Sequence, residues 1–206
     1  MNDNENRIAV LGGSFNPVHN GHLAVAHAVM AAHAPARLLF VPNRRPPHKG
    51  HGALAPAHHR VEMIRLAIAD EPAFEVSTIE LEREGPSYTY DTATELRRAL
   101  PEAEILFIIG SDCLFELHTW YRARELVDIV RLIVVTRERG LEDALQAAGG
   151  FLPEGTVKRM GADAVVMEPV EVSSTQIREA LVAGENATGL VPDSVRDYME
   201  EHRLYV

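Results

Sequence analysis

Short apolar runs alternate along this chain with longer segments in which apolar residues recur every three or four positions. The apolar runs are rich in β-branched residues and predict six strands, at 7–11, 37–41, 74–79, 104–109, 131–135 and 164–167. Segments of helical spacing lie between them, at 21–33, 57–70, 89–100 and 122–129. This alternation predicts an α/β fold: a doubly wound, mostly parallel, Rossmann-like sheet with helices on both faces.

Other segments depart from this alternation. Residues 43–56 are rich in proline and glycine and predict a long surface loop, which in a compact domain is often functional. Residues 141–163 predict a short helix and a poorly defined connection, to which we assign no role. Hydroxyl residues at 173–175 predict a helix start, and a last helix is expected at 193–202. Because no linker or repeat is visible, we expect one domain over 1–206, including the C-terminal helical segment 174–206.

Composition narrows the class of protein. A chain of 206 residues that is 46% hydrophobic can bury a full core, and its net charge of -10 disfavours general binding to nucleic acid. No segment is long enough to cross a membrane, and the polar N-terminus lacks the apolar stretch of a signal peptide. The single cysteine, Cys113, cannot form an internal disulfide. We therefore expect a cytoplasmic enzyme with no membrane partner; the sequence leaves open whether it forms a homo-oligomer.

The most informative motif follows the first predicted strand, where residues 12–22 read GGSFNPVHNGH. Glycine at Gly12 and Gly13 lets a phosphate approach backbone amides, although a tight turn explains two glycines equally well. His19 and His22 are three residues apart near a helix start, so both imidazoles can face one ligand. Either histidine alone suits capping or packing. Together they predict donors that stabilise charge on a phosphate during transfer.

A second motif opens the predicted helix near the C-terminus. Ser173, Ser174 and Thr175 precede Arg178 by less than two turns. The free amides of a helix start attract anions, and hydroxyls and an arginine add donors for a polyphosphate. Ordinary capping explains one hydroxyl, and redundant caps beside a surface arginine remain an alternative to a phosphate site.

These motifs resemble the HxGH nucleotidyltransferase superfamily and its second, hydroxyl-rich signature closed by arginine. Further segments resemble, in order and approximate spacing, the bacterial nicotinate mononucleotide adenylyltransferases. The similarity runs from about Arg7 to Tyr205. The segments that carry it are 42–49 (PNRRPPHK), 86–92 (PSYTYDT), 109–112 (IGSD) and 119–121 (TWY).

The resemblance implies that ATP and nicotinate mononucleotide give nicotinate adenine dinucleotide and pyrophosphate, by direct in-line attack on the α-phosphorus. It implies His19, His22 and Arg178 as catalytic residues. Magnesium is expected to bind mainly through the ATP phosphates, so no protein metal ligand is predicted. The residues expected to bind ATP are Gly12, Gly13, Ser14, Phe15, Gly110, Asp112, Ser173, Ser174 and Thr175.

For the acceptor, the resemblance implies that Trp120 stacks on the pyridine ring and that amides near Tyr88 and Thr89 receive the nicotinate carboxylate. Asn43, Lys49 and, more weakly supported, Arg137 complete the predicted acceptor site. Each of three residues also has a structural alternative to ligand binding. Trp120 could simply pack against other side chains, Asp112 could cap a helix, and Arg137 could be a solvated surface residue.

The chain departs from the family pattern at one position, and the same motifs also fit two rival functions. Asn16 stands where the family usually has aspartate, and we expect activity to survive because the turn-forming side chain is kept. One rival is a transferase of the same superfamily with another acceptor, such as nicotinamide mononucleotide or phosphopantetheine. The other is a non-catalytic nucleotide sensor, which would have no need for His19, His22 and Arg178.

Overall fold

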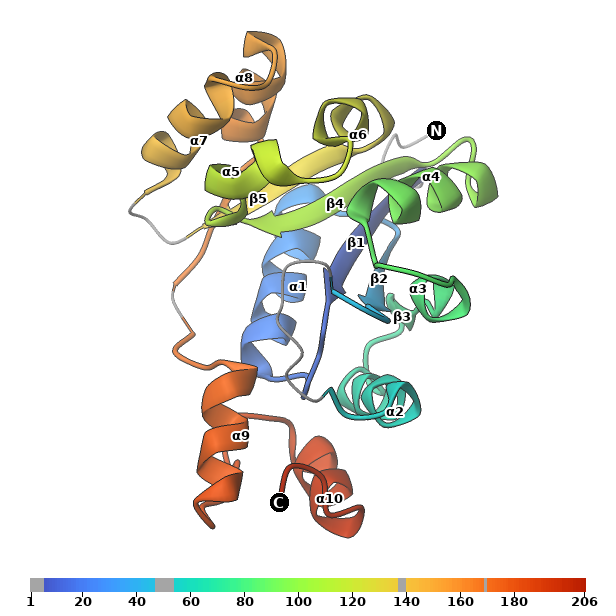
Figure 1. Ribbon diagram of the computed structural model, residues 1–206, viewed down its shortest axis with the longest axis vertical. Helices are drawn as coiled ribbons and strands as arrows, with labels where there is room; N and C mark the ends of the chain where they lie inside the picture. Colours follow the sequence, from blue (N-terminus) through green and yellow to red (C-terminus); the bar gives the residue numbers. More distant parts are fainter. Residues whose placement is uncertain (1–5, 47–53, 137–139, 169) are drawn as a thin grey trace.

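The computed structural model describes residues 6–46, 54–136, 140–168 and 170–206, and its centre is one six-stranded parallel sheet (Figure 1). The strand order is β3-β2-β1-β4-β5-β6. The strands are β1 Arg7–Gly13, β2 Arg37–Pro42, β3 Phe74–Val76, β4 Glu104–Gly110, β5 Arg131–Thr136 and β6 Val165–Val166. The first strand, β1, lies in the middle of the sheet, and the order in which later strands are added reverses between β1 and β4. Doubly wound sheets bind their ligands at this position.

Alternate residues of each strand supply two cores, one on each face of the sheet. Ala9 and Leu11 of β1 face one core, whereas Ile8 and Val10 face the other. All four are less than 9% exposed, as expected for a sheet that is covered on both sides. The predicted α/β doubly wound, Rossmann-like class is therefore confirmed.

The helices divide between the two faces (Figure 1). The first core is covered by α1 Asn20–His33, α2 Ala57–Ala67, α9 Ser174–Val182 and α10 Asp193–Glu201. The second core is covered by α4 Thr89–Ala99, α5 Cys113–Glu116, α6 Ala123–Ile129, α7 Leu141–Gly149 and α8 Glu154–Ala162. Two short elements, α3 Ile79–Glu82 and the 3₁₀ turn η2 Leu117–Thr119, complete the order.

Three sequence predictions of elements need correction. The third strand ends at Val76, not at residue 79, because Ile79 opens α3 and Glu80 turns into the protein. The last strand has only the two residues Val165 and Val166. The segment 141–163 holds two helices, α7 and α8, which contact each other and bury Ala144, Ala148 and Met160 in the second core. Helix α8 contains Gly155 and Gly161, and glycine has a low helix propensity, so the second helix is hard to predict from the sequence.

No helix among the described residues is long and apolar enough to span a membrane.

Candidate active site

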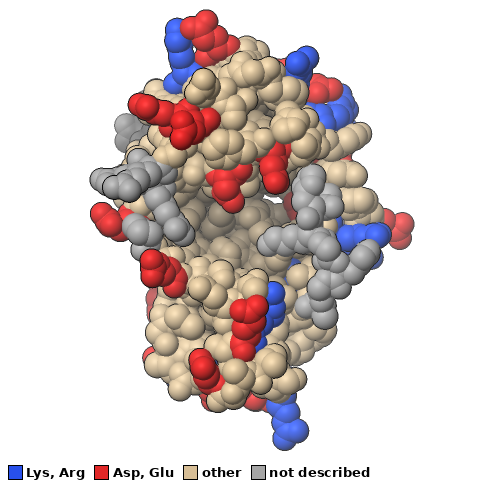
Figure 2. Space-filling model, turned by 60° about the vertical axis from the view of Figure 1, so that its left-hand side comes forward, with Lys and Arg blue, Asp and Glu red and all other residues tan. Residues whose placement is uncertain are grey.

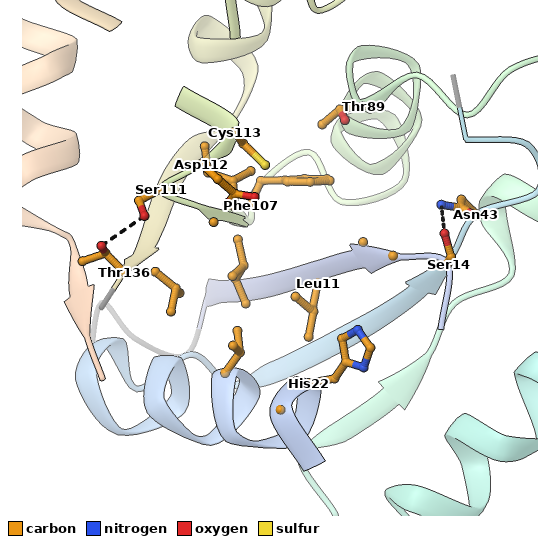
Figure 3. A pocket seen from close by; sticks show the side chains of 18 of the residues that line it. Leu11, Ser14, His22, Asn43, Thr89, Phe107, Ser111, Asp112, Cys113 and Thr136 are labelled. Carbon is orange, nitrogen blue, oxygen red and sulfur yellow. Dashed lines mark hydrogen bonds between the residues drawn. The ribbon is translucent and has the colours of Figure 1, made fainter. Parts of the chain in front are cut away.

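A cavity of about 760 Å³ lies at the carboxyl ends of β1, β4 and β5. The start of α1, the turn before α4 and the segment around Met167 close its sides. Figure 3 shows side chains from these elements pointing into one space, with His22 on the α1 side and Thr89 on the α4 side. The cavity therefore occupies the point where the strand order reverses.

Glycines leave the ends of the two central strands bare. A Cβ atom on Gly13 would lie 3.1 Å from the ring of Phe15, and one on Gly12 would contact Phe107. At the end of β4, the carboxylate of Asp112 folds over Gly110 and occupies the place of a Cβ atom. Asp112 precedes α5 but makes no side-chain cap hydrogen bond. Backbone amides and this carboxylate are thus accessible from the cavity.

The two predicted histidines begin α1 and stack on each other. Their ring centroids are 3.7 Å apart and the rings are inclined by 27°. The backbone N–H of His19 donates to Nδ1 of His22 across 3.2 Å. Because Nδ1 accepts this hydrogen bond, the ring proton of neutral His22 sits on Nε2. His22 therefore offers an N–H donor from the ring edge opposite the backbone, while both histidines line the cavity.

The first turn of α9 is tied to the loop between β1 and α1. Oγ of Ser174 donates to the carbonyl of Pro17 across 2.8 Å, and Nη1 of Arg178 donates to the carbonyl of Asn16 across 2.8 Å. Arg178 also donates to Oγ1 of Thr175 at 3.2 Å. Ser173 acts as an ordinary cap that accepts from the amide of Gln176. Ser174 and Arg178 thus contact the loop between β1 and α1, but none of these four residues lines the cavity.

The opposite side of the cavity is aromatic. Tyr88 precedes α4 and lies 4.7 Å from Tyr121, centroid to centroid, while Trp120 both lines the cavity and packs on the second core. Thr89 is the first residue of α4, so its amide has no acceptor within the helix. Asn43 also lines the cavity, and its Nδ2 donates to Oγ of Ser14, in the loop between β1 and α1, at 3.4 Å (Figure 3).

Comparison with known proteins identifies the arrangement. Residues 10–180 match the cytidylyltransferase-like family. The nicotinate-nucleotide adenylyltransferase of Bacillus subtilis is 39% identical over 199 residues, which cover 97% of this chain and 98% of that one. A chain of Symbiobacterium thermophilum described as "Probable nicotinate-nucleotide adenylyltransferase" is 44% identical over 201 residues, covering 97% and 95%. This chain belongs to the nicotinate-nucleotide adenylyltransferases.

A solved structure gives the same fold for the family. The Plasmodium falciparum nicotinic acid mononucleotide adenylyltransferase complexed with NaAD superposes with a TM-score of 0.75, over 98% of both chains and at 20% identity. The fold is thus shared at a sequence identity too low to carry residue roles, which must be argued from this chain.

Most predicted site residues of this adenylyltransferase lie together, with some exceptions. The cavity is lined by Gly12, Gly13, Ser14, His19, His22, Asn43, Tyr88, Thr89, Gly110, Asp112 and Trp120. Phe15 lies outside the lining: its side chain is 1% exposed, and its ring packs edge-on against His22 at 4.9 Å, so it supports the site from below. Lys49 and Arg137, both predicted to bind the acceptor, lie outside the described residues.

Glu80 was not predicted as a site residue, yet it lines the adenylyltransferase cavity and is only 5% exposed. Oγ1 of Thr92 donates to Oε1 of Glu80 at 2.6 Å, and Nη2 of Arg83 donates to the same hydroxyl at 3.1 Å. Burial raises the pKa of Glu80 above its ordinary value. The residue was assigned next to a strand ending at 79, which hid its helical, inward-facing position.

Because His19 is buried, we expect this adenylyltransferase to lose stability at acidic pH. Burial lowers the pKa of His19 from 6.5 to about 4, so the folded state disfavours the protonated ring. The contribution of His19 to the free energy of unfolding is therefore fully present above pH 6.5 and is lost as the pH falls toward 4. The loss is about 2.5 kcal/mol at pH 4.5. Urea unfolding at pH 7 and pH 4.5 measures the loss. A His19→Gln variant should lose about 2.5 kcal/mol less between these two pH values than the original protein, and equal losses would contradict the assignment to His19.

Proposed function

We infer that this protein joins ATP and nicotinate mononucleotide to give nicotinate adenine dinucleotide and pyrophosphate, a step of NAD biosynthesis. The observation that carries this inference, together with the family, is that one cavity is lined by residues from both predicted halves of the site. The glycine loop and the histidine pair stand on one side, and Tyr88, Thr89 and Trp120 stand on the other. Two substrates bound against these walls bring their phosphates together between β1 and β4.

The chemistry asks little of the protein beyond placing two anions. An oxygen of the mononucleotide phosphate forms a bond to the α-phosphorus of ATP, and the bond from that phosphorus to the oxygen bridging to the β-phosphate breaks. Pyrophosphate leaves with the electron pair of that bond. The nucleophile is already ionised at neutral pH, so no general base and no covalent enzyme intermediate is needed. What the reaction needs is donors at the oxygens of the α-phosphate, where charge builds up.

His22 fits the role of that donor. Its Nε2 carries the proton, and its ring is held from both sides by His19 and Phe15. A donor that is already oriented needs no rearrangement at the moment of reaction, which is the property that makes such groups effective. In the protein alone, burial lowers the pKa of His19 to about 4, so its ring is neutral at physiological pH.

The outer phosphates of ATP are assigned to the first turn of α9. Ser174 and Arg178 already bind the loop that carries the histidines, so phosphates held there would be aligned with that loop. The described lining contains Glu80, Asp112 and Glu168 but no lysine or arginine, and Figure 2 shows acidic side chains around the hollow on this side of the molecule. This distribution supports magnesium entering on the ATP phosphates, where it would neutralise their charge.

The acceptor half is assigned from the start of α4. Thr89, the first residue of α4, lines the cavity and its amide has no acceptor within the helix, and the partial positive charge of the helix start favours a carboxylate there. An amide-bearing nicotinamide nucleotide would present its own N–H groups to these donors and leave one of them unpaired. Nicotinate mononucleotide is therefore the expected acceptor. A cytoplasmic location stays a prediction from sequence, and the oligomeric state stays open.

An acceptor assay tests the proposal. With ATP and magnesium, we expect pyrophosphate release to be at least about tenfold more efficient with nicotinate mononucleotide than with nicotinamide mononucleotide, because one donor stays unpaired with the amide. Initial rates of pyrophosphate formation give kcat/KM for each acceptor. Release with phosphopantetheine alone would indicate the rival transferase, and binding of ATP without release in any mixture would indicate a sensor.

A further inference from the structure

We propose that Tyr205, the residue before the last, is a positioning residue for the ATP half of the site. Its hydroxyl holds Asn16, and through Asn16 it fixes the loop between β1 and α1 that carries Ser14 at one end and leads into His19 at the other. This proposal deepens the proposed function and rests on it. It assigns a role to the C-terminus that the sequence motifs did not indicate.

The contact between the two residues is a direct, partly buried hydrogen bond. The hydroxyl of Tyr205 donates to Oδ1 of Asn16 across 2.8 Å, and the backbone N–H of Ala55 donates to the same oxygen across 2.9 Å. Asn16 is only 3% exposed. An oxygen that is buried and accepts two hydrogen bonds has little freedom to move, so the Asn16 side chain is fixed from the C-terminus and from the segment before α2.

A buried arginine braces the same loop next to Asn16. Arg60 of α2 is 2% exposed; its Nη1 donates to the carbonyl of Ser14 at 2.8 Å and its Nε donates to the carbonyl of Ala55 at 3.0 Å. The hydroxyl of Tyr205 lies close enough to the guanidinium groups of Arg60 and Arg178 to interact electrostatically with both. Tyr205 is thus the group shared by the loop, by α2 and by the arginine of α9.

The loop needs this support because its backbone is not in a relaxed conformation. Phe15 has φ of +46°, in the left-handed region that side chains other than glycine rarely adopt. Such a conformation persists only where surrounding contacts impose it. Arg178 binds the carbonyl of Asn16, so a shift of Asn16 would displace both the loop and the arginine assigned to the outer phosphates.

The geometry also makes the effect selective. Every contact of Tyr205 described above reaches the glycine loop, α2 or α9, whereas the acceptor wall is formed by the turn before α4 and by Trp120. Loosening the loop should therefore weaken productive binding of ATP and leave binding of the mononucleotide unchanged. A residue that merely stabilised the fold would not separate the two substrates.

The test compares Tyr205→Phe with Tyr198→Phe, each of which removes one hydroxyl. Tyr198 is a matched control because it lies on α10, and its hydroxyl is bonded to Nδ1 of His59 at 2.8 Å, away from the loop. Initial rates are measured with ATP varied at saturating nicotinate mononucleotide and with the substrates reversed. For Tyr205→Phe we expect the KM of ATP to rise about fivefold to tenfold while the KM of the mononucleotide stays within about twofold. Tyr198→Phe should leave both KM values unchanged.

The proposal would be overturned if the KM of ATP in Tyr205→Phe stayed within about twofold of the original value. A fall in kcat alone, with a melting temperature lowered as far as in Tyr198→Phe, would then indicate that Tyr205 only stabilises the fold. Calorimetric titration with ATP keeps the test independent of the assigned acceptor. If the unmodified protein binds ATP but turns over no acceptor, the proposed function fails, whereas about fivefold weaker ATP binding by Tyr205→Phe would still support the positioning role.

Discussion

Replacement of His22 by alanine is expected to lower kcat by about 100-fold to 1000-fold and to leave the KM of ATP within about threefold. The reason is that Nε2 of His22 carries a proton fixed by the hydrogen bond at Nδ1, and the α-phosphate oxygens gain charge only as the new bond forms. A donor matched to the transition state changes the barrier more than it changes binding. Steady-state rates with ATP and nicotinate mononucleotide, each varied in turn, measure the two effects separately.

His27→Ala is the matched control for this experiment. His27 lies on the same helix α1 but on the surface, where it faces Glu71 at 3.4 Å. Its removal should leave kcat and both KM values unchanged. If His22→Ala instead raised the KM of ATP as much as it lowered kcat, His22 would be an ordinary binding contact and the donor role assigned to it would be wrong.

Replacement of Thr89 by proline is expected to lower kcat/KM for nicotinate mononucleotide by about 10-fold to 100-fold, with a much smaller loss for nicotinamide mononucleotide. Proline removes the amide proton that we assign to the carboxylate. The first position of a helix tolerates proline, and Tyr88 before it has φ of -77° and ψ of 131°, which suits a residue that precedes proline. Helix α4 should therefore persist, as circular dichroism and thermal unfolding would show.

Thr89→Ala separates the amide from the side chain, because it keeps the N–H group and deletes only the hydroxyl and methyl groups. It should retain the preference for nicotinate mononucleotide. Should Thr89→Ala narrow that preference as much as Thr89→Pro does, the side chain and not the amide would be the recognition element. An equal loss for both acceptors in Thr89→Pro would show a distorted site and no selective donor.

Strands and helices were predicted correctly where the residues that indicate them lie close together in the sequence. Strand β1 and helix α1 were predicted to within two residues because a run of apolar residues and a helical repeat are both visible in a short window. The strand β3 was predicted too long because residues 77–79 include the β-branched Thr78 and Ile79, whereas in the structure Ile79 begins α3. The second helix of the segment 141–163, α8, was not predicted because it contains Gly155 and Gly161, and glycine disfavours a helix.

The candidate site was predictable where its groups lie at strand ends. Gly12 lies at the end of β1, His22 and Asp112 come after β1 and β4, and the ends of neighbouring parallel strands meet at one edge of the sheet. Glu80 was missed because nothing in its own neighbourhood shows that it faces a cavity formed by other segments. Phe15 was assigned to the ligand because its position in a motif does not show on which side of the loop its ring lies.

The sequence by itself determined the alternation of strands and helices, the phosphate-binding motif after β1 and the family to which the chain is similar, since all of these are written in residues near each other. Only the tertiary structure decided how distant segments support that motif. Ser174 reaches Pro17 across 157 positions of the chain, and Tyr205 reaches Asn16 across 189. Contacts of this kind depend on how helices pack around the sheet, and a periodic pattern along the chain records which face is buried but not what is buried against it.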